Sequence, residues 1–326
     1  MNYGLPYKGS KNRIAKKILD VLPAAPVLYD VFCGGCAITH AALLSGKYSR
    51  VVANDINGMI PAAFQKAIHG GYAHEDRWIS REDFERLKDT DAYAAMCYSF
   101  GNDCRTYMYA RGLEPYKRAL HYAIFWKDTG PWRELCPETA DALKKAVESE
   151  QDRHKRRIGA GRAIVTALKA GLMNGTIDPA VMDKPIYRKI RKEKTPGLSL
   201  HLQSAISLEC RLQSLKSPER ITDVDVPPVL TVTTGDYRAL NFERGGIIYC
   251  DPPYKSTEER YGREFDFAGF YSWCEHQANP VFISEYTMPE DRFVPVAEWD
   301  KVTTMAAKMT THVTERLWRP RCQLGI

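Results

Sequence analysis

Ile247-Ile248-Tyr249-Cys250 leads directly into Asp251-Pro252-Pro253-Tyr254, so a short apolar run ends in an acid, two prolines and an aromatic residue. The apolar run predicts a buried strand, and in open α/β sheets the carboxyl ends of the strands line the ligand crevice. Two successive prolines hold φ at about −65° and remove two N–H donors, which leaves a stiff loop with carbonyl acceptors. We therefore expect the four residues of this loop to lie in a ligand site.

The loop offers a matched pair of hydrogen-bond acceptors. The carboxylate of Asp251 and the carbonyl of Pro252 are adjacent in the chain, and together they suit the two hydrogens of an amino group. Tyr254 adds a flat face on which a planar heterocycle can stack. The lone pair of an amine on a nucleobase is delocalised into the ring, and two acceptors would free it towards an electrophile. The loop therefore indicates chemistry on the exocyclic amine of a base.

Sheet-forming segments occur on both sides of the loop. Upstream, a glycine turn at Gly34-Gly35 separates a strand from a helix, and a second strand ends at Asp55, as in half of a nucleotide-binding fold. The expected strands are 27–32, 51–55, 229–233, 247–250 and 281–284, with a closing hairpin from 299–304 and 313–318. Helices are expected at 37–44, up to residue 68, and after Ser10 as an N-cap. This pattern predicts an α/β protein with a Rossmann-like sheet.

The central part of the chain has a different pattern. Residues 74–226 have a helical, aromatic and charged pattern, with no run typical of a buried parallel strand. Because surface insertions of this length are tolerated, we predict one split domain, 1–73 with 227–326, and a largely helical inserted domain at 74–226.

Basic residues concentrate in this predicted insertion. Between Gln151 and Thr195 twelve lysines and arginines accompany four acids, an excess of eight, whereas the whole chain carries a net charge of +6. A basic block on an otherwise near-neutral protein favours a polyanion partner, nucleic acid first, although a solvated helix face would give the same charges. The predicted DNA-binding residues are Arg153, Lys155, Arg156, Arg157, Arg188, Lys189, Arg191 and Lys192.

The nine cysteines and the N-terminal sequence bear on the compartment. The cysteines are odd in number and irregularly spaced, which is typical of reduced thiols. Cys33 and Cys36 form one CxxC without the further ligands of a zinc site, so we interpret them as a structural thiol pair and expect no metal. The sequence shows no signal peptide and no run of about 20 apolar residues. We expect a cytoplasmic protein without membrane contact, associated with the nucleoid when bound to DNA.

Three motifs occur in the order known from one family. They are Tyr7-Lys8-Gly9-Ser10-Lys11, Asp30-Val31-Phe32-Cys33-Gly34-Gly35-Cys36 and the Asp-Pro-Pro-Tyr loop. With them the chain resembles the Dam-like (D12 class) adenine-N6 DNA methyltransferases over about half its length, and we expect a phage or prophage member. The resemblance implies a class I methyltransferase sheet, S-adenosylmethionine as cofactor, and methyl transfer to N6 of adenine at a short specific sequence in double-stranded DNA.

The resemblance also assigns roles to residues. It implies contacts to S-adenosylmethionine from Tyr7, Lys11, Asp30, Phe32, Gly34, Gly35, Asp55, Asp236 and Asp251, and catalytic roles for Asp251, Pro252, Pro253 and Tyr254. Lys11 could meet the methionine carboxylate, and Asp55 the ribose hydroxyls. Asp236 could instead be a helix N-cap. Cys36 departs from the family pattern because it stands where the family has a glycine.

Other activities remain open at this point. A cytosine-N4 methyltransferase or an RNA adenine methyltransferase can carry a related loop, and a catalytically inactive DNA-binding protein could keep the fold. In cytosine-N4 enzymes the loop more often begins with serine, so the acid Asp251 favours adenine as the target. The motif at residues 7–11, before the first strand, fits the DNA methyltransferases better than the RNA enzymes. The sequence does not indicate the recognition sequence, the oligomeric state, or whether the protein serves restriction-modification or acts alone.

Overall fold

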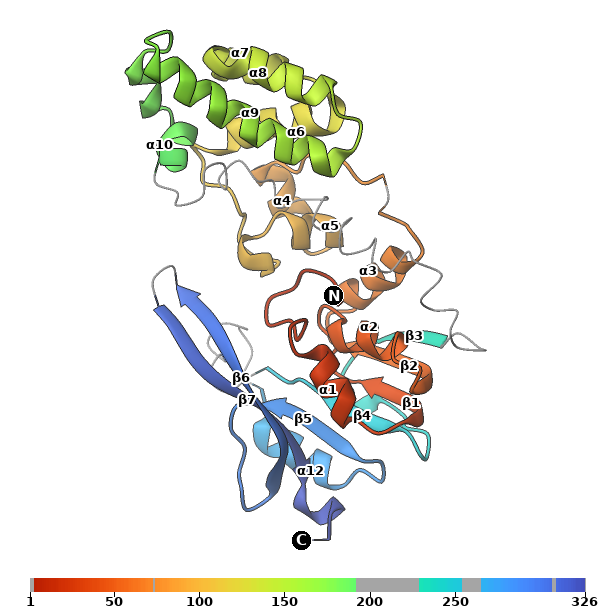
Figure 1. Ribbon diagram of the computed structural model, residues 1–326. Helices are drawn as coiled ribbons and strands as arrows, with labels where there is room; N and C mark the ends of the chain where they lie inside the picture. Colours follow the sequence, from red (N-terminus) through yellow and green to blue (C-terminus); the bar gives the residue numbers. More distant parts are fainter. Residues whose placement is uncertain (1–2, 73, 192–228, 254–264, 307–308, 326) are drawn as a thin grey trace. The chain divides into compact units, whose positions relative to one another are not determined.

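The structure is a computed structural model that describes residues 3–72, 74–191, 229–253, 265–306 and 309–325, with backbone alone for 191, 301–306 and 309–312. It comprises two compact units (Figure 1). Met1–Gly71 with Arg211–Ile326 form what we call the sheet unit, and Tyr72–Cys210 form the helical unit. The sequence also predicts a linker at 223–228 and a helix around 202–214, and both lie outside the described residues.

The sheet unit contains, within its described residues, a seven-stranded sheet of order β3-β2-β1-β4-β5-β7-β6. The strands are β1 (Ala25–Asp30), β2 (Tyr48–Asp55), β3 (Val229–Thr234), β4 (Ile247–Cys250), β5 (Val281–Glu285), β6 (Phe293–Ala306) and β7 (Met309–Pro320). The first five pair in parallel, whereas β7 is antiparallel to both β5 and β6. The prediction of an α/β, Rossmann-like methyltransferase sheet is confirmed, and the closing hairpin is longer than expected.

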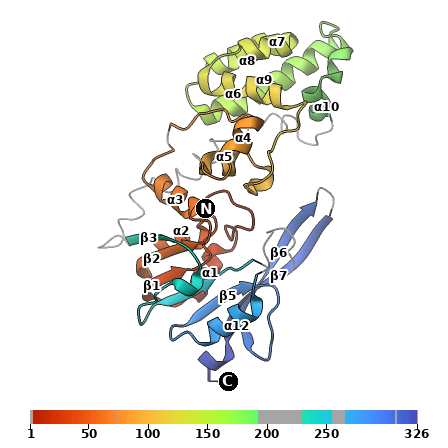
Figure 2. The same ribbon diagram turned by 180° about the vertical axis from the view of Figure 1, so that it is seen from behind.

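Helices cover both faces of this sheet, as Figures 1 and 2 show from opposite sides. Alternate residues of β1 enter different cores: Leu28 packs with α1 (Ala15–Val21) and α2 (Ala37–Leu43), and Val27 and Tyr29 pack with α12 (Phe267–Glu275). Strands buried on both faces are expected to be continuously apolar, which is the pattern of β1, β4 and β5. A further helix, α3 (Met59–Ile68), follows β2.

One helix begins later than the sequence indicates. We expected Ser10 to cap the first helix, but α1 begins at Ala15, and its N-cap residue Ile14 makes no side-chain capping bond. The hydroxyl of Ser10 instead accepts a hydrogen bond from the backbone N–H of Asn12 at 3.3 Å. The residues between them form turns, and these turns place Lys11 in a buried position.

The order of the strands creates a switch point in the sheet. From β1 the chain proceeds to β2 and then to β3, at one edge, and it returns to β4 on the other side of β1. Adjacent strands β1 and β4 therefore have connections that leave in opposite directions, and in open α/β sheets ligands bind at such a point beyond the carboxyl ends. Asp30 ends β1 and Asp251 follows β4, so both acids lie at this point.

The described part of the helical unit consists of helices and connecting segments. Its α-helices are α4 (Arg81–Leu87), α5 (Ala92–Cys97), α6 (Glu114–Trp126), α7 (Gly130–Leu135), α8 (Pro137–Glu148), α9 (Arg153–Met173) and α10 (Pro185–Arg191), with 3-10 turns η1 (Phe100–Asn102) and η2 (Pro179–Asp183). Short polar side chains begin several of them: Ser80, Asp91 and Asp152 each accept hydrogen bonds from backbone N–H groups of the first turn. Proline occurs in the first turns of α6, α7 and α8.

Candidate active site

An ion pair connects the N-terminal motif to the loop after β4. The Nζ of Lys11 lies 2.6 Å from Oδ1 of Asp251, and 3.7 Å from Oε1 of Glu315 on β7. The side chains of Lys11 and Glu315 are 4% and 0% exposed, and that of Asp251 is 19% exposed. Asp251 is thus held at the switch point, with part of its surface open to a ligand.

The charge of this ion pair is secured by its surroundings. Burial by itself would lower the pKa of Lys11, but the carboxylates of Asp251 and Glu315 raise it above the usual lysine value. The ammonium therefore stays protonated near neutral pH, and it holds Asp251 by a charge-assisted hydrogen bond. Sequence patterns did not indicate Glu315, because a strand-borne acid 64 positions after Asp251 belongs to no motif of the loop.

The glycine turn between β1 and α2 packs against the N-terminal segment. A Cβ on Gly35 would lie 2.6 Å from Cβ of Tyr7 and 2.9 Å from the carbonyl oxygen of Leu5, so only glycine fits there. The backbone N–H of Leu5 donates to the carbonyl of Gly35 at 2.7 Å. The structure therefore brings two motifs that are distant in sequence, Tyr7 and the Gly34-Gly35 turn, into contact.

Cys36, at the position where the family pattern has a glycine, adopts a left-handed backbone conformation. Its φ is 58°, and it is the N-cap residue of α2. The Sγ atoms of Cys33 and Cys36 lie 3.7 Å apart, and both residues are buried and not disulfide-bonded. Burial raises the pKa of both thiols, so they stay protonated and act as small apolar groups.

Asp30 is a buried acid with one satisfied oxygen. Its Oδ2 accepts hydrogen bonds from the backbone N–H of Thr39 at 3.0 Å and from its hydroxyl at 2.6 Å. Its Oδ1 is buried and has no hydrogen-bond partner among the described residues. Burial raises the pKa of Asp30 to about 7, although the hydrogen bonds of Thr39 lower it. An orphaned acceptor at the switch point suits a donor from a ligand.

Asp55 at the end of β2 is tied to the glycine turn. Its Oδ2 accepts from the backbone N–H of Gly34 at 2.9 Å, and its Oδ1 accepts from Asn57 at 2.8 Å. Each carboxylate oxygen can accept a second hydrogen bond, as a ribose diol would provide. Burial raises the pKa of Asp55, and the two backbone donors act against this.

Asn54 is a buried residue of this edge that the sequence analysis missed. Its amide donates to the carbonyls of Val31 and Gly235, both at 3.1 Å, and its Oδ1 accepts from the hydroxyl of Thr233 at 3.0 Å. These bonds tie the ends of β1, β2 and β3 together. The signal for it was weak, because an asparagine before a strand-end acid also fits an ordinary turn.

Asp236 is the N-cap residue of the 3-10 turn Tyr237–Ala239. Its side chain accepts from the backbone N–H of Arg238 at the start of a 3-10 turn and forms a two-pronged ion pair with the guanidinium, at 2.9 and 2.6 Å. Hydrogen bonds from Arg238 lower the pKa of Asp236. Next to it, the half-buried ring of Phe32 packs against the buried ring of Tyr237, with ring centres 5.1 Å apart and planes tilted by 43°.

Of the loop itself, Pro252 is buried and Pro253 is half-buried. Tyr254 lies outside the described residues. The stacking role of Tyr254 therefore stays a prediction from the sequence and the resemblance.

The predicted DNA-binding residues differ in their surroundings within the helical unit. Lys155, Arg188 and Lys189 are exposed, and Arg153 and Arg157 are half-buried. Arg153 lies 3.5 Å from Asp76 and over the ring of Phe125. Lys192 and the side chain of Arg191 lie outside the described residues.

Arg156 has to be removed from the DNA-binding set. It is 4% exposed, and its guanidinium donates to the backbone carbonyls of Glu150, Ile124 and Gln151. The sequence could not separate it from its neighbours, because α9 begins with an unbroken basic run and only the packing of α6 and α9 decides which side chain turns inward.

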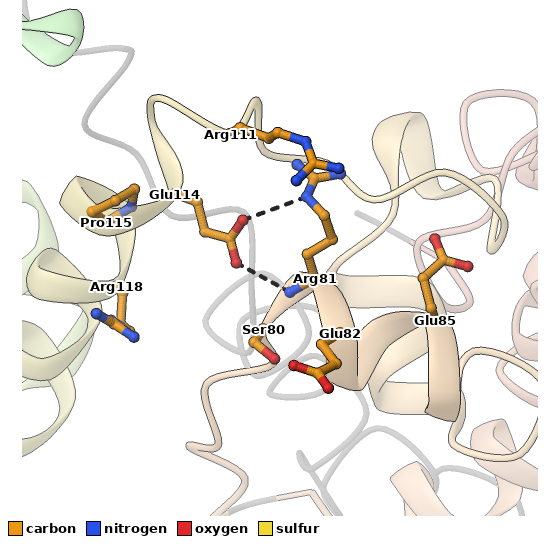
Figure 3. Close-up of a pocket in the computed structure, with 8 residues that line it drawn as sticks. All are labelled: Ser80, Arg81, Glu82, Glu85, Arg111, Glu114, Pro115 and Arg118. Atoms are coloured by element: carbon orange, nitrogen blue, oxygen red, sulfur yellow. Dashed lines mark hydrogen bonds and ion pairs between the residues drawn. The ribbon is translucent and has the colours of Figure 1, made fainter.

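The helical unit also has an open hollow of about 470 Å³ (Figure 3). It is lined by Ser80, Arg81, Glu82, Glu85, Arg111, Glu114, Pro115 and Arg118. Three arginines and three glutamates balance one another, and Arg81 pairs with Glu114 at 3.6 Å. None of the predicted site residues lines this hollow, and its balanced charge offers no preference for an anion.

The described residues offer neither a metal cluster nor a membrane-spanning helix. No group of three or more His, Cys, Asp or Glu side chains able to hold a metal ion occurs within the described residues. Of the described helices, none combines the length and apolar character required to cross a bilayer.

The sheet with its switch point and glycine turn defines a Rossmann-like methyltransferase fold. Residues 7–119 match the family model described as D12 class N6 adenine-specific DNA methyltransferase, which is about a third of the chain. The match includes Lys11, the glycine turn and Asp55, and it ends before Asp251. It supports the resemblance to the Dam-like family and an activity on DNA adenine. A search of curated proteins found no significant match.

Proposed function

We propose that the protein transfers a methyl group from S-adenosylmethionine to N6 of adenine in double-stranded DNA, at a short specific sequence. The observation that carries this proposal is the carboxylate of Asp251, held by Lys11 directly after β4 at the switch point of the sheet. The family match over residues 7–119 supports the same activity from a separate part of the chain. An action on DNA would place the protein in the cytoplasm at the nucleoid, and we retain a phage or prophage origin as part of the proposal.

Asp251 and Pro252 would bind the target amine. The carboxylate and the Pro252 carbonyl accept one hydrogen each, and Lys11 fixes the carboxylate through Oδ1 before the base arrives. Fixing an acceptor in advance lowers the entropic cost of orienting the amine, which is the main contribution available to a direct displacement. In this proposal Lys11 orients Asp251 instead of contacting the methionine carboxylate, because its described ionic contacts are two carboxylates.

The residues at the strand ends fit S-adenosylmethionine. The orphaned Oδ1 of Asp30 suits the methionine ammonium, and Asp55 suits the ribose hydroxyls. The Gly34-Gly35 turn leaves room for close approach of the backbone, and Phe32 with Tyr237 offers an apolar surface for a planar base. Held by these residues, S-adenosylmethionine would supply an electrophilic methyl group beside the amine that Asp251 and Pro252 would orient.

The basic end of α9 supports DNA binding by the helical unit. Lys155 is exposed in the first turn of α9, with Arg153 and Arg157 half-buried beside it. Because Asp152 already caps the backbone of this helix end, the side chains would supply the contacts to DNA phosphates. The target adenine would leave the base stack to reach Asp251, since its amine is otherwise inaccessible.

Transfer of a tritiated methyl group from S-adenosylmethionine to DNA tests the proposal, followed by sequencing that distinguishes N6-methyladenine. We expect label in adenine within one short motif, and its loss in Asp251→Ala with cofactor affinity nearly unchanged. Asp20→Ala is the control, because Asp20 is an exposed acid of the same unit that pairs with Lys16 on the surface of α1. Persistent adenine methylation in Asp251→Ala would refute the role of the loop.

Other outcomes select between the remaining activities. Label in N4 of cytosine would show that cytosine is the target instead of adenine. Label in RNA alone would show that RNA is the substrate instead of DNA. Cofactor binding without any transfer would identify a DNA-binding protein that has kept the fold.

A further inference from the structure

The hairpin of β6 and β7 continues past the end of β5 (Figures 1 and 2). β7 is antiparallel to β5, and their pairing ends where Glu285 lies opposite Arg316. Glu285 is the last residue of β5, whereas β7 begins at Met309, so residues 309–315 of β7 lie beyond the carboxyl end of β5. Residues 299–306 of β6 pair with them, and we call this two-stranded extension the arm.

We propose that the arm is a second DNA-binding element, which enters the major groove next to the target adenine with the face that carries Lys301, Thr303 and Thr311. This inference rests on the proposed function and deepens it, because it adds a DNA contact from the sheet unit. From 301 to 306 and from 309 to 312 the arm is described by its backbone, and its residues there are placed by register.

The base of the arm adjoins the candidate active site. Glu315, at the base of the arm on β7, lies 3.7 Å from the Nζ of Lys11, and that ammonium lies 2.6 Å from Asp251. An adenine that leaves the stack and binds at Asp251 stays joined to its strand on both sides, so the duplex has to pass along the carboxyl edge of the sheet. The arm extends from this edge, and it is therefore in a position to reach the neighbouring base pairs.

The size and charge of the arm fit a DNA groove. Seven residues of a strand span about 23 Å, and a two-stranded ribbon fits the major groove, which is about 12 Å wide. Between Asp300 and Glu315 the sequence has no acidic residue, but it has two lysines, one histidine and five threonines. Threonine is also common in ordinary strands, whereas lysines without any acid nearby favour an anionic partner. Lysine contacts phosphates, and threonine hydroxyls bond to phosphates or to base edges.

The cross-strand register divides the arm into two faces. Residues directly opposite each other in an antiparallel pair lie on the same face, and the faces alternate along each strand. One face carries the pairs Trp299 with Glu315, Lys301 with Val313 and Thr303 with Thr311. The other face carries the pairs Asp300 with Thr314, Val302 with His312 and Thr304 with Thr310. Because Glu315 lies beside Lys11, the first face continues the side of the sheet that bears the site, and we assign this face to DNA.

The base of the arm is anchored to the end of β5. The guanidinium of Arg316 donates to the carbonyl of Tyr286 at 2.8 Å and lies 3.3 Å from the carboxylate of Glu298 on β6. The Nε1 of Trp318 donates to the carbonyl of Glu285 at 2.9 Å. These bonds fix both strands at the base, so DNA binding by the arm would require less ordering than binding by an unanchored loop.

Fluorescence anisotropy of a labelled duplex of mixed sequence, with the full-length protein, tests the contact. In Lys301→Ala we expect an affinity about fivefold lower and a salt dependence reduced by about one ion, because one phosphate contact is lost. The double variant Thr303→Val with Thr311→Val keeps the shape and the strand preference of both side chains but removes their hydroxyls. In this variant we expect an affinity about fivefold lower with an unchanged salt dependence.

The matched control is the double variant Thr304→Val with Thr310→Val, which makes the same change on the opposite face of the arm. It should alter the affinity for the duplex by about twofold at most. An equal loss in this control would overturn the assignment of the face. Titration calorimetry with S-adenosylmethionine is the second readout, and its dissociation constant should be the same in every variant because the arm binds DNA and not the cofactor.

The opposite results would overturn the inference. Unchanged DNA affinity in Lys301→Ala and in the variant of Thr303 and Thr311 would show that the arm does not contact DNA. A parallel loss of cofactor affinity would show that it only supports the site. A wild-type dimer in analytical ultracentrifugation that these variants convert to monomers would show that the arm joins two copies of the chain.

The proposed function is tested separately by methylation. In each of these cases, transfer of methyl groups to adenine by the wild-type protein would leave the proposed function standing while the role of the arm is refuted. A wild-type protein that does not bind the duplex would overturn both proposals.

Discussion

Lys11 and Asp251 are 240 positions apart in the chain, yet their Nζ and Oδ1 atoms lie 2.6 Å apart. One residue belongs to the turns before α1 and the other to the loop after β4, so this bond joins the N-terminal segment to the proposed catalytic loop. The sheet alone does not produce this contact, because each residue lies outside the strands. The ion pair therefore contributes both to the position of Asp251 and to the stability of the sheet unit.

The first prediction concerns the stability that this ion pair provides. In Lys11→Met two largely buried carboxylates lose their cation, and the free energy of unfolding should fall by about 3 kcal/mol. Urea denaturation at neutral pH measures the loss. Lys16→Met is the control, because Lys16 forms an exposed ion pair with Asp20 one turn along α1, and its loss should cost about 0.5 kcal/mol or less. Equal effects of the two substitutions would contradict a stabilising role for the buried pair.

The second prediction concerns the pH dependence of stability, through Asp30. Burial raises its folded-state pKa to about 7, above its unfolded value of about 3.8, so the folded state binds a proton over this range that the unfolded state has lost. The contribution of Asp30 is therefore most favourable below pH 4 and is lost as the pH rises towards 7. In Asp30→Asn this dependence should disappear, so the variant gains relative to the wild-type protein as the pH rises from 4 to 7.

Urea denaturation at several values of pH between 4 and 8 measures this difference. Asp20→Asn serves as the control because Asp20 is exposed on α1, and the difference between this variant and the wild-type protein should stay nearly constant. A difference for Asp30→Asn that is equally constant would show that Asp30 titrates as an ordinary acid.

The sequence predicted the sheet well because its strands are short apolar runs that end in acids or glycines. The interval 247–250 agrees with β4, and the expected end at Asp55 agrees with β2. The first strand was expected at 27–32, but β1 ends at Asp30, which places this acid at the same edge as Asp55. The pairing and order of the strands follow from the crossover connections between parallel strands, which allow few alternative topologies. This order creates the switch point between β1 and β4.

The parts that the sequence did not predict depend on packing between distant segments. Glu315 reaches the site only because the hairpin of β6 and β7 pairs with β5, and Asn54 in β2 acts through bonds to the ends of β1 and β3. Arg156 appeared equivalent to its basic neighbours until burial separated them. The helix cap expected at Ser10 was wrong because the turns that follow it bury Lys11 beside Asp251.

The third prediction separates DNA contact from structural support in α9. Lys155→Ala should weaken DNA binding several-fold and reduce the dependence of affinity on salt by about one ion, because an exposed lysine that contacts a phosphate releases one counterion. Its effect on the free energy of unfolding should be about 0.5 kcal/mol or less. Fluorescence anisotropy with a labelled duplex at several salt concentrations provides both quantities.

Arg156→Ala is the matched comparison one position away. This variant leaves three backbone carbonyls without their charged donor and opens a buried space, so the free energy of unfolding of the helical unit should fall by about 3 kcal/mol. Among variants that remain folded at low temperature, the salt dependence of DNA binding should not change. A changed slope in Arg156→Ala, with an unchanged slope in Lys155→Ala, would reverse the assignment.

The fourth prediction concerns the contact between the N-terminal segment and the glycine turn. In Gly35→Ala the new Cβ would lie 2.6 Å from Tyr7 and 2.9 Å from the carbonyl oxygen of Leu5, so backbone has to move, and we expect a loss of about 2 kcal/mol in stability together with weaker cofactor binding. Gly159→Ala is the comparison, because a Cβ there, within α9, meets nothing within 4 Å and should stabilise the helix by about 0.5 to 1 kcal/mol. Thermal denaturation and calorimetry measure both effects. Unchanged cofactor affinity in Gly35→Ala would show that the turn supports the fold alone.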